Sequence, residues 1–249
     1  MADSGATVTA AVLVIGNEIL SGRTKDANLP YLGKRLNDCG IRLLEARVVR
    51  DDEGEIVAAV NALRARYDYV FTTGGIGPTH DDITADCIAK VFGLPLLVNP
   101  EARALLLGHY GEDELTEARL RMARTPEGAS LIENEVSRAP GFRVENVFVM
   151  AGIPRVMQAM FEAIAEDLEG GRPLVSRTVV ARAPESRLAG PLAEAQLRFP
   201  AVEMGSYPFR DETGFGAELV LRGGEIAEVE EAAAALRAAL AELGVEADS

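Results

Sequence analysis

The first 170 residues alternate short apolar runs with helix-like segments, and this order constrains the fold more than any other feature. Residues 12–15 form a continuous apolar run that ends at Gly16, and residues 69–72 form a second strand-like run. Apolar residues recur at helical spacing in 29–39 and 56–63. A strand buried on both faces is apolar throughout, whereas a helix on a sheet is apolar on one side. The order predicts an α/β fold, with helices on both faces of a mostly parallel sheet.

Further elements of this region follow from the same patterns. We expect strands at 41–49 and 144–150, and helices at 81–92 and 111–128.

The pattern changes after residues 170–173, where the sequence Gly-Gly-Arg-Pro is typical of a linker. Residues 174–243 have the order strand, helix, strand, strand, helix, which predicts a small α+β (βαββα) module. The predicted domains are 1–170 and 172–249.

The charge and composition exclude several classes of partner. The 249 residues contain 39 acidic and 25 basic side chains, a formal net charge of −14, which argues against nucleic acid or an anionic membrane as the partner. The apolar run at 10–15 is too short for a signal peptide or a membrane span, so a cytoplasmic protein is expected. Cys39 and Cys87 fall on apolar faces of predicted helices and are expected to be buried free thiols.

Residues 72–84, TTGGIGPTHDDIT, contain the main functional signal. They connect a predicted strand to a predicted helix, the position at which α/β proteins bind phosphate-bearing ligands. Glycines allow positive φ angles and a close approach of the backbone to a ligand, and their N–H groups can bind an anion. The alternative is a tight turn without a ligand. The predicted phosphate-binding residues of this loop are Thr73, Gly74, Gly75, Gly77, Pro78, Thr79 and Thr84.

Two adjacent carboxylates, Asp81 and Asp82, accompany this loop. Asp82 lies three residues after Thr79 and could complete a capping box, and Asp81 could be a first-turn acid favoured by the helix dipole. Capping needs only one of them. A divalent cation that bridges carboxylate and phosphate oxygens accounts for both, with Asp82 in the more direct contact.

A second polar cluster, at 16–28, follows the first predicted strand and therefore lies at the same carboxyl edge of the sheet. Glu18 and Asn28 are predicted to face the ligand, and Arg23 and Lys25 to supply positive charge to phosphates. The alternative is a solvated loop with Asp26 as a helix N-cap.

A third candidate is Asp51, which follows the predicted strand at 41–49. Asp52 has a structural explanation as an N-cap, with Glu55 three residues later. Asp51 has none, so we predict that it belongs to the site. His80 is either an acid or base or a solvated loop residue.

Several catalytic signatures are absent from the sequence. There is no HExxH, no Walker loop and no recognisable Ser/His/Asp set, and Gly74-Gly75-Ile76-Gly77 is not the dinucleotide fingerprint GxGxxG. Hydride transfer with a nicotinamide is therefore not expected.

Residues 73–84 resemble the signature of the MoaB/Mog molybdopterin-binding superfamily, and more narrowly that of the N-terminal domain of the CinA family of competence/damage-inducible proteins. The loop of that branch is TGGLGPTxDDxT, from which only Ile76 departs. Residues 16–22 and 49–52 are similar to two further motifs of the branch, and 26–28 to its DTN, with Ala27 in place of Thr.

Residues 151–161 are similar to the PGVPxEMxxMF segment of the branch. Ala151 replaces its proline and Val156 its glutamate.

The resemblance implies a three-layer α/β/α domain over 1–170, and 172–249 resemble the small KH-like middle domain of CinA. The C-terminal deamidase domain of CinA, which acts on nicotinamide mononucleotide, has no counterpart here, so that activity is expected to be absent. Mog-type members bind molybdopterin and adenylylate it. The CinA branch is linked to metal-dependent hydrolysis of ADP-ribose, and a related domain of eukaryotic FAD synthase to cleavage of FAD.

In the Mog pattern an Arg-Asp pair follows the loop, and here Asp81 occupies the Arg position. The exchange of a cation for a second carboxylate favours a metal-bridged site over molybdopterin binding.

The leading hypothesis is a pyrophosphatase of ADP-ribose or a similar nucleoside diphosphate derivative, dependent on Mg²⁺ or on Mn²⁺ or Co²⁺. Asp82, Asp51 and Glu18 are the predicted catalytic residues, and Asp81, Asp82 and Asp51 the predicted metal ligands. The alternatives are a molybdopterin adenylyltransferase-like protein and a regulatory nucleotide-binding module without turnover.

The last predicted helix, at 226–243, is rich in Ala and Leu. Together with the habits of the family it predicts a homo-oligomer, a dimer before a trimer.

Overall fold

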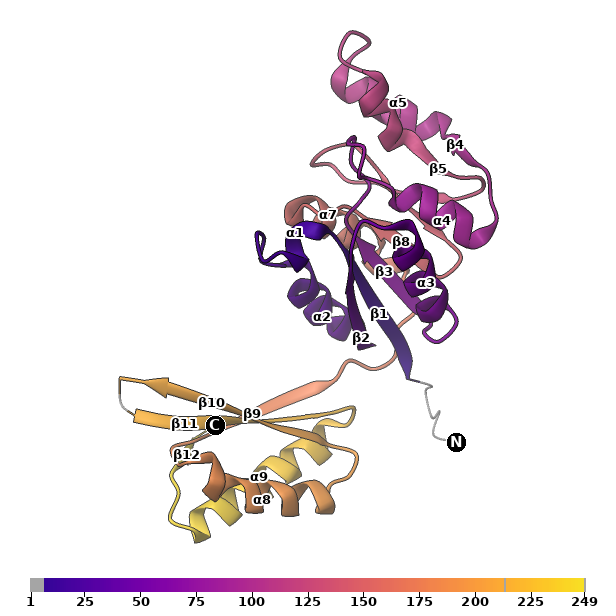
Figure 1. The fold of residues 1–249 in the computed structure, drawn as a ribbon. Coiled ribbons are helices and arrows are strands. Elements are labelled where there is room, and N and C mark those ends of the chain that lie inside the picture. Colours follow the sequence, from indigo (N-terminus) through magenta and orange to yellow (C-terminus); the bar gives the residue numbers. More distant parts are fainter. Residues whose placement is uncertain (1–6, 213, 249) are drawn as a thin grey trace, which may run out of the picture. The chain divides into compact units, whose positions relative to one another are not determined.

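A computed structural model describes residues 7–212 and 214–248. The first six residues of the predicted first domain, Thr213 in the turn between two predicted strands, and Ser249 lie outside the described residues. The chain divides into two compact units, Met1–Gly171 and Arg172–Ser249 (Figure 1).

The strands and helices of the first unit follow one another in the expected alternation. Its strands are β1 (Val8–Ile15), β2 (Ile41–Val49), β3 (Tyr69–Thr73), β4 (Leu96–Val98), β5 (Arg124–Pro126), β6 (Ser130–Ile132), β7 (Gly141–Val144) and β8 (Val147–Met150). Its helices are α1 (Asn17–Leu20), α2 (Asn28–Asp38), α3 (Glu53–Arg64), α4 (Thr84–Phe92), α5 (Pro100–Tyr110), α6 (Glu117–Leu120) and α7 (Pro154–Ile164).

The main sheet has the strand order β2-β1-β3-β8-β7-β6. Strands β2, β1, β3 and β8 are mutually parallel, and β7 and β6 are added antiparallel. Strand β1 lies inside this sheet, with Val12 paired to Ala46 on one side and to Phe71 on the other. This position explains the continuous apolar run, because both faces and both edges of the strand are covered.

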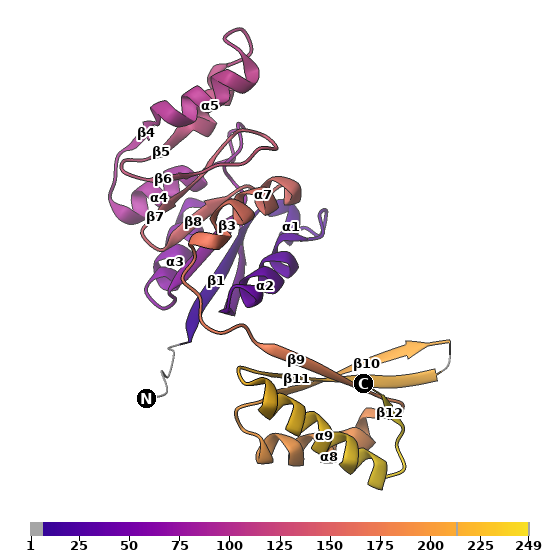
Figure 2. The ribbon, with the colours of Figure 1, turned by 180° about the vertical axis from the view of Figure 1, so that it is seen from behind.

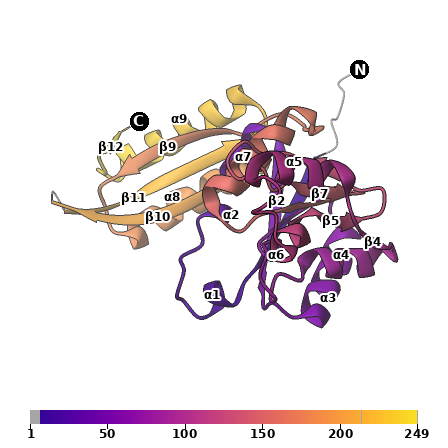
Figure 3. The ribbon, with the colours of Figure 1, turned by 90° about the horizontal axis from the view of Figure 1, so that it is seen from above.

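Two apolar clusters lie on opposite faces of the sheet. Leu13 packs with residues of α3 and α4 in one cluster, and Val12 packs with residues of α2 and α7 in the other. Figures 2 and 3 show these helix pairs on either side of the strands. The predicted three-layer α/β/α fold with a mostly parallel sheet is confirmed.

The segment predicted as one strand at 144–150 is a hairpin of β7 and β8. The chain turns at Glu145, which has a φ of 50°. The side chain of Asn146 donates hydrogen bonds to the carbonyl oxygens of Arg64 and Tyr67. These two bonds hold the turn against the C-terminal end of α3 and the residues that follow it.

The expected helix at 111–128 is also wrong. Only α6 and the following 3₁₀ turn at Arg121–Ala123 are helical, and the chain then enters β5. The Thr116 hydroxyl caps α6 by accepting a hydrogen bond from the N–H of Arg119. Pro126 disfavours a helix that runs through it, because proline has no N–H group to donate. Residues 96–126 thus form an excursion from the sheet, built from β4, α5, α6 and β5.

The second unit contains β9 (Val175–Ala181), α8 (Glu185–Arg198), β10 (Glu203–Asp211), β11 (Gly214–Gly223), α9 (Ile226–Glu242) and β12 (Ala247–Asp248). Its sheet has the order β10-β11-β9-β12, and its pairs are antiparallel. Leu188 of α8 and Leu236 of α9 pack with Leu219 of β11 in one core. The predicted α+β order is confirmed, with the short strand β12 added.

Among the described residues, no helix combines the length and apolar character needed to cross a bilayer. Cys39 and Cys87 are both free, and Cys87 is buried as expected, whereas Cys39 is half-buried. Burial raises the pKa of the Cys87 thiol to about 12, so it stays protonated at neutral pH.

Helices α2 and α7 are joined by a polar contact around Glu162. Its carboxylate accepts hydrogen bonds from the Tyr31 hydroxyl and from Nε and Nη2 of Arg35, the latter two at 2.7 Å each. The bond from Arg35 is the main reason that the pKa of Glu162 falls from 4.5 to about 2.

We expect Glu162→Gln to lower the urea midpoint of the first unit at pH 7. Because the folded pKa is the depressed one, this carboxylate stabilises the fold fully above about pH 4.5, and the contribution is lost as pH falls toward about 2. The difference between wild type and variant should therefore narrow over that window. Glu166→Gln, an exposed neighbour, is the control, and a difference that stays constant down to pH 2 would contradict the prediction.

Candidate functional site

A cavity of about 620 Å³ opens at the carboxyl edge of the main sheet. Its lining includes residues that follow four parallel strands within two positions, namely Gly16 after β1, Asp51 after β2, Gly74 after β3 and Ala151 after β8. This is the place predicted for a ligand in an open α/β sheet. The volume is in the range of small-molecule sites.

The glycine loop needs its glycines for close packing. Gly74 and Gly75 have φ angles of 104° and 68°. A Cβ at position 74 would lie 2.2 Å from the carbonyl oxygen of Ile15, and one at 75 would lie 2.1 Å from Oγ1 of Thr84. Gly77 does not adopt a positive φ, but a Cβ there would lie 2.7 Å from Oδ2 of Asp82. The loop conformation therefore disfavours side chains at 74 and 75, and at 77 a Cβ would require the Asp82 carboxylate to move.

The same loop presents unused hydrogen-bond donors. The backbone N–H groups of Gly75, Ile76 and Gly77 donate to no acceptor within the part of the chain that the structure describes. All three residues line the cavity. Successive free N–H groups beside a helix start are the donors that bind an anion.

Asp81 and Asp82 share one hydroxyl group. Oγ1 of Thr79 lies 2.5 Å from Oδ1 of Asp81 and 2.5 Å from Oδ2 of Asp82, and the N–H of Thr79 also donates to Asp82 at 2.8 Å. The bond from Thr79 is the main cause that lowers the pKa of Asp81. A hydroxyl has one hydrogen, so it satisfies only one of the two carboxylates at a time.

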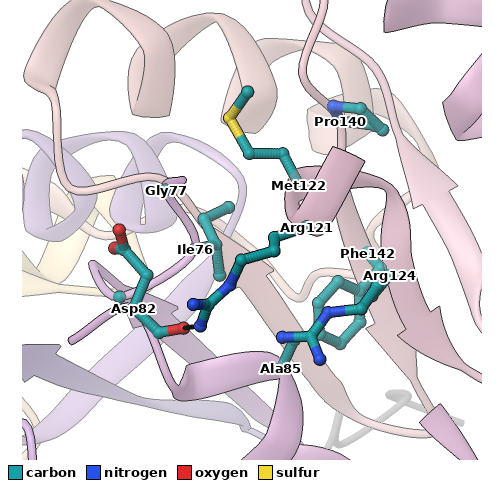
Figure 4. Close-up of a pocket in the computed structure, with 10 residues that line it drawn as sticks. Ile76, Gly77, Asp82, Ala85, Arg121, Met122, Arg124, Pro140 and Phe142 are labelled. Atoms are coloured by element: carbon teal, nitrogen blue, oxygen red, sulfur yellow. Dashed lines mark hydrogen bonds between the residues drawn. The ribbon is translucent and has the colours of Figure 1, made fainter. Parts of the chain in front are cut away.

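The carbonyl oxygen and the carboxylate of Asp82 point in different directions, as Figure 4 shows. Its carbonyl oxygen faces the guanidinium of Arg121, with Nη2 at 3.4 Å, and its carboxylate lies on the other side. Arg124 lies nearby and pairs with Asp86 at 3.0 Å. Both arginines line a narrow crevice behind the loop, and neither lines the main cavity.

Glu18 and Asp51 occupy the ends of neighbouring strands, and both line the cavity. The Glu18 carboxylate folds over Gly16, where a Cβ would lie 2.5 Å from both of its oxygens. Oδ2 of Asp51 accepts a hydrogen bond from the N–H of Asn17 at 2.9 Å. Through Oδ2, Asp51 thus fixes the start of α1, a structural role that the sequence pattern did not indicate. Its other oxygen, Oδ1, does not take part in this bond.

Asn28, Thr73 and Thr84, predicted to bind the ligand, are buried instead of lining the cavity. Nδ2 of Asn28 donates to the carbonyl oxygen of Gly152 at 2.8 Å, and the Thr84 hydroxyl donates to that of Gly74 at 3.0 Å. These bonds tie together the turns that surround the cavity. Thr79 is exposed but does not line it.

The charge of the cavity is strongly unbalanced. Among the described residues that line it, Glu18, Asp51, Asp81 and Asp82 are acidic and only Arg119 is basic. Arg119 is already paired with Glu114, with Nη1 and Oε2 3.0 Å apart. Arg23 and Lys25, predicted to supply positive charge, are exposed and are not part of the lining.

The acidic lining fits a hard divalent cation only in part. Carboxylate oxygens are suitable ligands, and Asp81 and Asp82 lie around one hydroxyl, with Nδ1 of the exposed His80 3.9 Å from Oδ1 of Asp81. However, no group of three or more His, Cys, Asp or Glu side chains within residues 7–212 and 214–248 is placed to hold a metal ion. A cation here needs oxygen atoms from its ligand as well.

The 96–126 excursion contributes to the site, which the sequence patterns did not indicate. The cavity lining includes Tyr110, Arg119 and Met122, which come from this excursion and not from the strand ends. Residues 111–128 were expected to be a helix, Tyr110 lies just before that range, and no motif marked these residues. His80, by contrast, is a solvated loop residue whose side chain is 96% exposed.

The comparisons with known proteins support the fold and the family resemblance. The model of the family described as "probable molybdopterin binding domain" matches residues 11–170, and that of "FAD synthase, middle domain" matches 173–249. A protein of Archaeoglobus fulgidus is 36% identical over 197 residues, 79% of this chain and 84% of the relative. One from Pyrobaculum calidifontis is 36% identical over 211 residues, 80% of each chain.

A solved structure gives the same result. The crystal structure of the protein CinA, of unknown function, from Thermoplasma acidophilum is 37% identical and superimposes with a TM-score of 0.61, covering 64% of this chain and 96% of that one. The resemblance drawn from the loop motifs is confirmed.

We expect Asn28→Ala to destabilise the first unit by about 1–3 kcal/mol, because the carbonyl of Gly152 would lose its buried donor. Urea unfolding of the variant measures this loss. Lys25→Ala, in the exposed part of the same loop, should change stability by less than about 0.5 kcal/mol. Equal stability of the two variants would show that Asn28 has no structural role.

Proposed function

We propose, from the premise that the chain belongs to the family of probable molybdopterin binding domains, that its cavity binds a phosphate-bearing small molecule and hydrolyses it. The proposed substrate is ADP-ribose or a similar nucleoside diphosphate derivative, and the proposed cofactor is a divalent cation, Mg²⁺ or else Mn²⁺ or Co²⁺.

The phosphate part of the proposal is supported by the glycine loop. Three successive N–H groups at Gly75, Ile76 and Gly77 are without acceptors among the described residues and border the cavity. Such donors bind phosphate oxygens without needing a positively charged side chain.

The observation that carries the cation part is the excess of carboxylates around those donors. A pyrophosphate has negative charge of its own, and among the described residues of the lining Glu18, Asp51, Asp81 and Asp82 are acidic, whereas only Arg119 is basic and it is already paired. At separations of a few ångströms this repulsion opposes binding unless a cation lies between the charges. Asp81 and Asp82 would hold that cation, and phosphate oxygens of the ligand would supply its further ligands, since no third carboxylate among the described residues is placed to join them.

The proposed reaction is attack of water on one phosphorus of the pyrophosphate. The bond from that phosphorus to the bridging oxygen breaks, and the bridging oxygen leaves with the other phosphate, so ADP-ribose gives AMP and ribose 5-phosphate. The cation supplies neutralisation of the developing charge and a more acidic water. Glu18 or Asp51 accepts the proton that the water loses, and the loop N–H groups hold the phosphates in place.

FAD and molybdopterin are the second candidates, and each is favoured by one match. Residues 173–249 match the middle domain of FAD synthase, and residues 11–170 match the molybdopterin-binding family. Asp81 beside the loop argues against a site in which a basic residue binds the phosphate.

We expect the protein to release AMP from ADP-ribose in the presence of Mg²⁺, Mn²⁺ or Co²⁺, and to lose this activity with EDTA. Asp82→Asn should lower kcat/KM by about 100-fold or more, because it removes a proposed cation ligand. The measurement is the amount of AMP released, determined by chromatography, with FAD tested as a second substrate in parallel.

Asp113→Asn, an exposed acid on the excursion, is the matched control and should keep full activity. If the wild type releases no more AMP than Asp82→Asn, the hydrolase proposal is wrong. Thermal stabilisation by ADP-ribose without product would then favour a regulatory binding module, and co-purified molybdopterin would favour the molybdopterin alternative.

A further inference from the structure

The 96–126 excursion brings an aromatic side chain to the cavity. Tyr110 is the last residue of α5, and Arg119 belongs to α6. Both line the same cavity as Gly77 and Pro78 of the glycine loop. Among the described residues of the lining, Tyr110 is the only aromatic one.

The ring of Tyr110 is held in place by its neighbours. The guanidinium carbon of Arg119 lies 4.1 Å from the ring centroid, and the ring of His109 meets it edge-on with centroids 4.6 Å apart. Tyr110 is half-buried against Leu106 and Ala123 of a small apolar cluster. Its orientation is therefore set before any ligand binds.

Arg119 is fixed in the same way. Its Nη1 donates to the carbonyl oxygen of Glu114 at 2.6 Å and lies 3.0 Å from Oε2 of Glu114. With its charge paired, this guanidinium is less suited to bind a phosphate than to support a ring face. Tyr110 and Arg119 together form a flat platform, which we call the Tyr110 platform.

The platform differs in chemistry from the rest of the polar lining. The strand-end clusters supply four carboxylates and the loop supplies N–H groups, whereas the Tyr110 platform supplies a π-surface, next to the thioether of Met122. A packing role alone would explain the contact of Tyr110 with its small cluster. It would not explain why the ring also borders the cavity.

We propose that the Tyr110 platform is the base-binding subsite of the cavity and that the ligand stacks an aromatic heterocycle on the face of Tyr110 opposite Arg119. Stacking on an aromatic side chain accepts any base with a π-face. This inference rests on the proposed function in taking the ligand to be a nucleotide, and it adds the residue that recognises the ring. It makes Tyr110 a specificity-determining residue, separate from the residues that bind phosphate.

The composition of the chain allows a direct test. The sequence contains no tryptophan, so Tyr110→Trp introduces a single indole that can still stack. Tyr207→Trp, at a position 52% exposed in the second unit, is the matched control. Fluorescence of each variant is followed while AMP, ribose 5-phosphate or pyrophosphate is added in the presence of Mg²⁺.

AMP should quench the indole at position 110, and ribose 5-phosphate and pyrophosphate should leave it nearly unchanged, because they have no ring. None of the three should affect the indole at position 207. In calorimetry, Tyr110→Ala should bind AMP about tenfold more weakly and pyrophosphate as tightly as the wild type. Tyr110→Phe should bind AMP and pyrophosphate like the wild type. That result would attribute the weaker AMP binding of Tyr110→Ala to loss of the ring and not to a folding defect.

Equal quenching by pyrophosphate and AMP, absence of AMP binding to the wild type, or unchanged AMP affinity in Tyr110→Ala would each overturn the inference. The proposed function is judged separately, by release of AMP from ADP-ribose. Quenching at position 110 without hydrolysis would retain the ring subsite and reject the hydrolase. Hydrolysis of ADP-ribose by Tyr110→Ala with the KM of the wild type would retain the hydrolase and reject the ring subsite.

Discussion

The contact between Gly74 and the end of β1 is the constraint on which the site depends. The backbone of residue 74 lies so close to the carbonyl oxygen of Ile15 that no Cβ fits between them, and a Cβ at Gly152 would in turn lie 3.2 Å from the Cα of Gly74. The ends of β1, β3 and β8 therefore meet through bare backbone. This packing holds the loop N–H groups and the carboxylates of the strand ends around one cavity.

Electrostatics then decides what the cavity accepts. Backbone donors attract an anion, while Asp81 and Asp82 on the same loop repel it. Arg121 and Arg124 do not line the cavity: they line the neighbouring crevice and contact the carbonyl oxygen of Asp82 and the carboxylate of Asp86. The two opposing fields are compatible when a cation and a phosphate bind together.

The sequence predicted those parts of the fold and site that depend on local pattern. The apolar run of β1, the cap at Asp52, which accepts from the N–H of Glu55, and the glycine loop were all identified from neighbouring residues. Asn28 was predicted to face the ligand because it belongs to the polar cluster after β1, and its bond to Gly152 spans 124 positions and leaves no local trace in the sequence. Tyr110 was missed for the same reason, since its approach to the cavity depends on how the excursion folds back.

The excursion has a consequence for how such a protein can change over time. The loop N–H groups come from residues 72–84, within the sheet framework, and the Tyr110 platform comes from residues 96–126, which leave the sheet and return to it. The two stretches are inherited as separate segments of chain. Substitutions or insertions in the excursion can alter the shape of the ring-facing wall while the strand ends, and the backbone contacts that join them, stay as they are.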